Sequence, residues 1–188
     1  KHEVLENGRV EVCRFAMLRE GRNPLQRAFR YFCCLLRQTV NGLKARNCDV
    51  LMLSSTPPIN GLMMPVLRRH KRYKIVYNLQ DIFPDSLVNT GMTRKGSLLW
   101  RIGRRIEDKA YRAADKILTI SEGFKANIVA KGVPEDKIVV IPNWVDEAAV
   151  VSVERADNPL FDRYGLERDR FYVCYSGNVG HTQNMPLL

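Results

Sequence analysis

The sequence predicts an α/β fold built around a parallel β-sheet, and two features of its pattern support this. Short continuous apolar runs recur along the chain, such as residues 49–53 (DVLML) and 74–79 (KIVYNL), which is typical of strands buried on both faces. Between these runs, apolar residues recur at helical spacing. Strands that alternate with helices indicate βαβ units with right-handed crossovers, and therefore a parallel sheet.

Five strands are expected in the first three quarters of the chain. The first is recognised by alternating apolar residues, and the others by short apolar runs. They cover residues 9–15, 49–53, 74–79, 116–120 and 137–141.

Helices are expected between these strands. Pro24 fits the first turn of one helix, Ser97 and Ser121 are natural N-caps of two others, and Gly132 is a natural C-cap. The first helix carries a stripe of Leu25, Phe29, Phe32, Leu36, Val40 and Leu43, and the helix after Ser97 a stripe of Leu98, Leu99, Ile102, Ile106, Ala110 and Ala113. The predicted helices cover residues 24–46, 60–70, 84–89, 98–114 and 122–131.

A second domain is expected to begin near the end of the chain. Residues 143–170 are polar and predict a linker with one short helix near 158–164. Residues 171–176 (FYVCYS) read as a new buried strand that enters a glycine-rich turn, a common start of a nucleotide-binding domain. We therefore assign residues 1–142 to an N-terminal domain, 143–170 to an interdomain linker and 171–188 to the start of an incomplete C-terminal domain.

The composition is that of a globular protein, with 45% apolar residues among 188. No apolar run approaches the roughly 20 residues that span a bilayer, and no signal-peptide pattern opens the chain. The five cysteines are odd in number, and no pair has metal-ligand spacing. We expect small buried residues in a reducing compartment, and no metal site.

Positive charge is concentrated in one part of the chain. The net charge is +10, and all of this excess lies in residues 21–80, where eleven Lys and Arg accompany a single acid, Asp49. Such a field favours an anionic partner: a phospholipid surface, a phosphorylated substrate or nucleic acid. The alternative is a solvated basic face that has no partner.

Several segments, in this order, carry a resemblance to a known family. They are residues 77–85 (YNLQDIFPD), 113–121 (AADKILTIS), 137–146 (KIVVIPNWVD), 163–166 (RYGL) and 175–180 (YSGNVG). Over residues 49–188 the chain resembles the family 4 glycosyltransferases. The subgroup that it resembles most makes bacterial surface polysaccharides such as O-antigen, capsule or colanic acid.

The resemblance implies a GT-B fold, in which two Rossmann-like domains face each other across a cleft. This chain would be the N-terminal, acceptor-side half without its first strand. The implied reaction is a retaining hexosyl transfer from a nucleotide-sugar co-substrate, with no cofactor and no obligatory metal ion. The family's main donor-binding residues lie in the second domain and are absent from this chain, so we expect the 188-residue chain alone to be inactive.

Candidate acceptor-binding residues follow two predicted strands, where ligands gather in open α/β sheets. Asp81 is the candidate to orient an acceptor hydroxyl, and so the catalytic candidate; its alternative role is as N-cap of a helix over 83–89. Many relatives carry a basic or imidazole side chain just before this Asp, which makes a catalytic role for Gln80 doubtful. The stretch after the earlier strand is alternatively a plain turn. The acceptor-binding set is Ser54, Ser55, Thr56, Asn78, Gln80 and Asp81.

Candidate donor-binding residues lie in the glycine-rich turn near the end of the chain. Two glycines there would let the backbone approach the donor phosphate. Alternatively, His181 is an ordinary exposed polar residue. The donor-binding set is Gly177, Asn178, Gly180 and His181.

The basic residues of the first two helices, with the apolar edge beside them, fit a helix that rests on an anionic membrane. The resembled subgroup commonly uses a polyprenyl-diphosphate acceptor on the cytoplasmic leaflet, which implies a bacterial cytoplasmic protein, peripheral on the inner face of the cell membrane. The alternative is a core helix with a solvated basic edge. The patch comprises Arg27, Arg30, Arg37, Lys44, Arg68, Arg69, Lys71 and Arg72.

Two rival functions are weaker. A nucleic-acid-binding domain would place aromatic residues among basic ones on an exposed platform, whereas the aromatic residues here fall mostly on predicted core stripes. A dehydrogenase or epimerase would need G-x-G-x-x-G after a strand, and this chain contains no such motif. The expected partners are therefore a nucleotide-sugar, a lipid-linked glycan and an anionic membrane surface, without nucleic acid.

Overall fold

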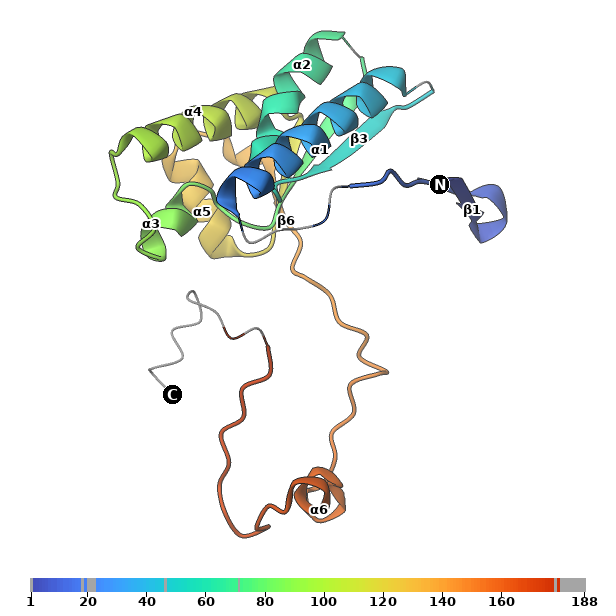
Figure 1. Cartoon of the computed structure of the whole chain (residues 1–188), viewed down its shortest axis with the longest axis vertical. Coiled ribbons are helices and arrows are strands. Elements are labelled where there is room, and N and C mark those ends of the chain that lie inside the picture. The colour runs from blue at the N-terminus through green and yellow to red at the C-terminus, as the bar shows by residue number, and fades with distance from the viewer. Residues whose placement is uncertain are drawn as a thin grey trace. The chain divides into compact units, whose positions relative to one another are not determined.

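The computed structural model describes residues 2–17, 19, 23–45, 47–70, 72–177 and 179. The chain divides into two compact units, Lys1–Ile141 and Pro142–Leu188 (Figure 1). Each unit is described by itself below.

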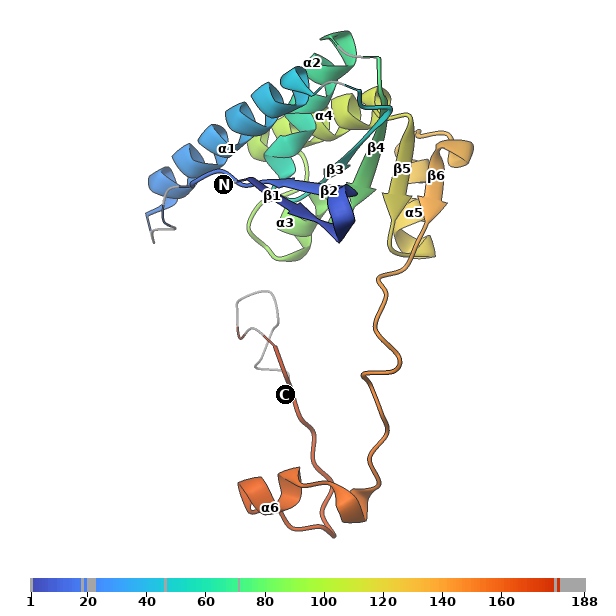
Figure 2. The same ribbon diagram turned by 90° about the vertical axis from the view of Figure 1, so that its right-hand side faces the viewer.

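The first unit is built on a four-stranded parallel sheet, which confirms the predicted α/β class. Its strands are β3 (Val50–Ser54), β4 (Lys74–Leu79), β5 (Lys116–Thr119) and β6 (Ile138–Val140). They lie side by side in sequence order (Figure 2). In the register of the sheet, Ser54 pairs with Asn78 and Leu79 with Thr119. The loops that follow β3 and β4 therefore emerge beside each other.

Helices connect these strands close to the predicted positions. Ser97 and Ser121 are confirmed as N-caps, because their hydroxyl oxygens accept hydrogen bonds of 3.2 Å from the backbone N–H of Trp100 and Phe124. Gly132 follows the last turn of its helix with φ +90°, a conformation that favours glycine. The helices are α1 (Pro24–Lys44), the 3-10 helix η2 (Pro58–Leu62), α2 (Met63–His70), α3 (Asp85–Asn89), α4 (Leu98–Ala113) and α5 (Glu122–Ala130).

The core of the first unit lies between the sheet and its helices. Met64 and Leu67 of α2 and Ala110 of α4 are fully buried, as are Ile75 of β4 and Ile117 of β5. Burying a large apolar side chain stabilises a fold by about 1.5–3 kcal/mol. These contacts hold the strand ends, and the loops that follow them, in fixed positions.

The strand predicted over residues 9–15 is not part of this sheet, so the prediction of five parallel strands is wrong. Strand β2 (Val10–Cys13) pairs antiparallel with β1 (His2–Leu5) in a separate two-stranded sheet. The turn between them holds Asn7 and Gly8 at φ 54° and 90°. Local pairing across so short a turn loses little loop-closure entropy.

The second unit contains the short helix expected near residues 158–164, here α6 (Leu160–Tyr164). Its Phe161 is buried beneath the guanidinium groups of Arg155 and Arg168, 4.8 and 5.1 Å from the ring centroid. The strand predicted over residues 171–176 is wrong, since these residues form no strand. The backbone N–H and C=O groups of a strand must form hydrogen bonds with a neighbouring strand. The described part of this unit contains no strand with which residues 171–176 could pair.

No helix in the described residues is long and apolar enough to cross a membrane. The five cysteines are free thiols. The prediction that all are buried is wrong, because Cys13 and Cys174 are exposed.

Candidate functional site

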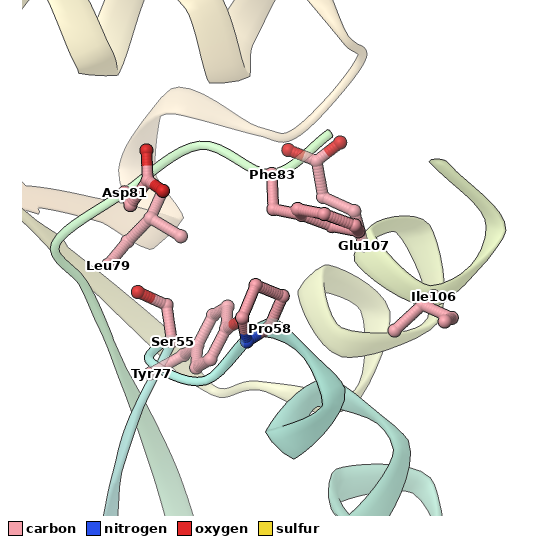
Figure 3. Close-up of a pocket in the computed structure, with 8 residues that line it drawn as sticks. All are labelled: Ser55, Pro58, Tyr77, Leu79, Asp81, Phe83, Ile106 and Glu107. Carbon is pink, nitrogen blue, oxygen red and sulfur yellow. The ribbon is translucent and has the colours of Figure 1, made fainter. Parts of the chain in front are cut away.

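A small pocket opens at the carboxyl ends of β3 and β4, where the sequence placed the acceptor-binding residues (Figure 3). Its cavity measures about 10 Å³, which holds about one water molecule. Asp81 and Glu107 stand on opposite sides of it. A hydroxyl group fits this space, whereas a sugar ring must lie over its mouth. Its lining residues are Ser55, Pro58, Tyr77, Leu79, Asp81, Phe83, Ile106 and Glu107.

The loop after β3 supplies the first predicted group. Ser55 is buried, and its hydroxyl accepts a hydrogen bond of 3.0 Å from the backbone N–H of Gln80. The Ser54 hydroxyl accepts a bond of 3.2 Å from the backbone N–H of Thr56 within the turn. Ser55 therefore ties the two loops together, while Ser54 and Thr56 are exposed beside the pocket.

The side chain of Asn60, in η2, holds the loop after β3 in place. Its amide donates hydrogen bonds of 3.2 Å to the backbone carbonyls of Ser54 and Thr56. The buried amide thus replaces the partners that these carbonyls would find in a regular strand.

The loop after β4 supplies the second predicted group. Gln80 donates a hydrogen bond of 2.9 Å from its side-chain amide to the side-chain oxygen of Asn78. Asp81 is exposed and forms no hydrogen bond or ion pair with the residues that the structure describes. The alternative role of Asp81 as a helix N-cap is wrong, because α3 begins after Pro84 without a side-chain cap. Its carboxylate is available to a ligand.

A charged cluster that was not predicted from the sequence lies beside the pocket and includes its lining residue Glu107. Glu107 of α4 is only 6% exposed, and its carboxylate accepts hydrogen bonds from Arg104, Tyr111 and Lys131, the last at 2.9 Å. Lys131 also forms an ion pair of 2.8 Å with Asp85 at the start of α3. The one available signal was the spacing of Arg104, Glu107 and Tyr111 on a single helical face.

Burial and charge shift the pKa values of this cluster. Burial raises the pKa of the Tyr77 and Tyr111 phenols, and the negative charge of Glu107 raises them further. Burial alone would also raise the pKa of the Asp85 carboxyl, but the hydrogen bonds and charge of Lys131 outweigh this and lower it. The two tyrosines therefore stay protonated donors, and Asp85 stays ionised, at neutral pH.

Helix α4 buries the later part of the predicted stripe, Ala110 and Ala113, but not its beginning. Leu98, Leu99 and Ile102, expected in the core, are 74%, 50% and 45% exposed, whereas Gly103 and Glu107 are buried. The buried face of α4 is instead narrow and partly polar, and it packs against the segment that carries Asp81.

The basic patch is only partly available to a partner. Arg68 forms a two-bond ion pair with Asp115, at 2.7 and 3.0 Å, and its charge is largely neutralised. Arg30 is half-buried, and Lys71 lies outside the described residues. Six members of the patch have exposed side chains, although Arg68 is paired with Asp115: Arg27, Arg37, Lys44, Arg68, Arg69 and Arg72.

Most of the apolar stripe predicted on the first helix faces away from the core. Five of its six members are 41–79% exposed, whereas the sixth, Leu43, packs against the core as predicted. Leu35, which lies off the stripe, is buried. Helix α1 thus shows apolar and basic side chains together on its exposed surface. The exposed stripe residues are Leu25, Phe29, Phe32, Leu36 and Val40.

The candidate donor-binding residues lie almost entirely outside the described part of the chain. Gly177 is exposed in the second unit. Asn178, Gly180 and His181 are not among the described residues.

Comparison with known proteins identifies the family of this chain. Residues 6–149 match the family described as Glycosyltransferase Family 4. The chain is 30% identical over 142 residues to a probable glycosyltransferase, WbjE, of Pseudomonas aeruginosa, a match that covers 76% of this chain and 35% of the relative. It is 26% identical over 125 residues to a putative colanic acid biosynthesis glycosyl transferase, WcaI, of Escherichia coli K12, covering 65% and 31%. The chain thus spans about a third of the length of these relatives, and it belongs to glycosyltransferase family 4.

Proposed function

We propose that this chain is the acceptor-side part of a retaining glycosyltransferase of the GT-B type. The enzyme transfers a sugar from a nucleotide-sugar to a polyprenyl-diphosphate-linked glycan in the synthesis of bacterial surface polysaccharide. The observation that carries this proposal is the exposed carboxylate of Asp81, which has no partner in the described residues, at the mouth of a pocket beyond two parallel strands. Membership of glycosyltransferase family 4 and the similarity to two glycosyltransferases support the reaction class.

In this proposal Asp81 accepts a hydrogen bond from the acceptor hydroxyl that attacks the sugar. Binding orients that hydroxyl and raises its nucleophilicity. The exposed hydroxyls of Ser54 and Thr56 lie on the neighbouring loop and bind the same glycan. Ser55 joins the two loops through the backbone N–H of Gln80, and the side chains of Asn78 and Gln80 bond each other within the second loop.

The donor side of the reaction belongs to a second domain. We propose that Gly177, Asn178, Gly180 and His181 contribute to binding the donor diphosphate. Cationic side chains and backbone N–H groups balance the charge that develops on the leaving diphosphate, so that no metal ion is required. The 188-residue chain alone then has no transferase activity, and detectable turnover by it would contradict this.

Substitution of Asp81 tests the role of this residue in a protein that joins this chain to a donor domain. Asp81→Asn keeps the size of the side chain but removes its charge. Hydrogen bonds to charged groups contribute about 1.5–3 kcal/mol, which corresponds to a loss of about 10–100-fold in kcat/KM for the acceptor. Asp136→Asn, an exposed carboxylate just before β6, is the matched control. Equal activity of the two variants would refute the proposal for Asp81.

We also propose that α1 rests on the anionic inner surface of the cell membrane. Its stripe of exposed apolar residues enters the interface, and Arg27, Arg37 and Lys44 face the lipid phosphates. This arrangement presents a lipid-linked acceptor to the enzyme at the surface where such lipids lie.

Sedimentation with vesicles tests this proposal. Each basic residue near an anionic surface contributes about 1 kcal/mol, so Arg27→Gln with Arg37→Gln weakens binding to phosphatidylglycerol vesicles by about 30-fold. Arg105→Gln, an exposed arginine of α4, is the control and leaves binding unchanged. Equal binding of the unmodified chain to neutral and anionic vesicles contradicts the electrostatic part.

A further inference from the structure

We propose that Lys131 and Glu107 are positioning residues that hold the Asp81 carboxylate in place for the acceptor. The inference rests on the proposed role of Asp81. Lys131 does not line the pocket, and Glu107 lines it on the side opposite Asp81; we infer that both act through the segment between β4 and α3 (residues 80–85).

This segment is fixed at both ends by side chains from other elements. At its start, the backbone N–H of Gln80 donates to the Ser55 hydroxyl at 3.0 Å. At its end, Asp85 accepts hydrogen bonds from Lys131 at 2.8 Å and from Asn127 at 3.3 Å. The position of Asp81 therefore depends on both attachments.

The Lys131 ammonium is itself held in one position by Glu107. It lies between two carboxylates, 2.9 Å from Glu107 and 2.8 Å from Asp85, and its side chain is 12% exposed. Rotation of Lys131 away from this position would leave the buried Glu107 short of one partner and Asp85 without its ion pair. Removing one partner of a buried ion pair is strongly destabilising, because the other charge is left buried without compensation. The cluster thus links α3 firmly to α4 and α5.

The middle of the segment, residues 82–84, packs closely against α4. Ile82 and Pro84 are buried, and Gly103 approaches so closely that a methyl group there would lie 2.8 Å from Phe83 and Pro84. Asp81 is the exposed residue between these fixed points. Its carboxylate is consequently preorganised, which lowers the entropy lost when an acceptor hydroxyl binds.

Kinetics in a protein that joins this chain to a donor domain test the inference. The acceptor probe is a short-chain polyprenyl diphosphate bearing one N-acetylhexosamine, and the donor is the nucleotide-sugar that the unmodified enzyme turns over fastest. Lys131→Met is expected to raise the acceptor KM about tenfold and leave the donor KM within twofold, while Lys131→Arg restores most of the affinity. Lys125→Met, in α5, removes an ion pair with Glu135 in the following turn, away from Asp81, and is the matched control.

A double variant that carries both Lys131→Met and Asp81→Asn distinguishes a positioning role of Lys131 from a general effect on protein stability. If Lys131 acts through Asp81, adding Lys131→Met to Asp81→Asn changes the acceptor KM less than twofold. A tenfold effect in both backgrounds, or equal rises in donor and acceptor KM, overturns the inference alone. An unchanged acceptor kcat/KM in Asp81→Asn itself overturns the proposed function, and the inference with it.

Hydrogen exchange in the 188-residue chain gives a second measurement that does not depend on catalysis. Glu107→Gln keeps the side-chain volume but removes the charge that holds Lys131, so backbone amides of residues 81–86 should exchange at least fivefold faster. Lys125→Met should leave these amides unchanged. Equal exchange in Glu107→Gln and in the unmodified chain contradicts the positioning role.

Discussion

Replacing Gly103 with alanine adds a methyl group where α4 comes closest to the segment that carries Asp81. An ideal Cβ at this position lies 2.8 Å from a ring carbon of Phe83 and 2.8 Å from the Cβ of Pro84. Both neighbours are rigid rings, and Pro84 is fully buried. Since real Cβ contacts are not found below 3.0 Å, the helix or the segment must move.

Two opposing effects set the size of the change. Alanine in a helix interior is favoured over glycine by about 0.8–1 kcal/mol. Overpacking a filled site costs about 1–3 kcal/mol. The clash outweighs the gain, and we expect Gly103→Ala to lower the free energy of unfolding by about 1 kcal/mol. For a chain of this size that corresponds to a fall in Tm of about 3 °C.

Gly123→Ala supplies the control for this prediction. It makes the same substitution in α5, where the nearest atom to the new Cβ is the Ser121 hydroxyl oxygen at 3.9 Å. Only the helix preference acts there, and we expect Tm to rise by about 1–2 °C. Thermal and urea unfolding followed by circular dichroism measure both variants. If Gly103→Ala stabilises the chain as much as Gly123→Ala does, α4 does not pack against Phe83 and Pro84 as described.

Three further substitutions test other features. Ser121→Ala removes the N-cap of α5 and should lower the free energy of unfolding in urea by about 1 kcal/mol, with an unchanged m-value. Met64→Ala should cost about 2–5 kcal/mol because Met64 is fully buried, whereas Val66→Ala, on the exposed side of α2, should cost far less. Burial alone would raise the pKa of the Asp115 carboxyl, but hydrogen bonds and the charge of Arg68 lower it below the unfolded value of about 3.9. Its stabilising effect is therefore complete above that pH and lost as pH falls through the folded pKa, so Asp115→Asn should flatten the acid side of the stability profile.

The strands of the sheet and the N-caps of the helices could be predicted because each depends on residues that are close together in the sequence. Strand β4 was predicted with its observed bounds, since KIVYNL is one short apolar run between polar turns. The cap at Ser121 is equally local, as one hydroxyl bonds an amide three residues later. The pairing of a strand is not local, however. Residues 10–13 were recognised as a strand, but their antiparallel partner, residues 2–5, was not.

The residues that shape the candidate site were the hardest to predict because their partners are distant in the sequence. Gln80 and Ser55 are 25 residues apart, Lys131 and Glu107 are 24 apart, and Asn127 and Asp85 are 42 apart. The apolar pattern of α4 favoured Ile102 as a core residue and gave no reason to bury Glu107. Helical periodicity identifies a stripe without identifying what covers it.

The exposed position of Asp81 and the burial of Glu107 have one physical explanation. A carboxylate that binds a ligand must stay solvated until the ligand arrives, whereas a carboxylate that fixes a loop acts best where water cannot compete for its partners. In this chain the exposed carboxylate has no partner among the described residues, and the buried one has three. The largely buried charges of Glu107 and Lys131 hold the segment in place. The exposed carboxylate of Asp81 stays open to an acceptor.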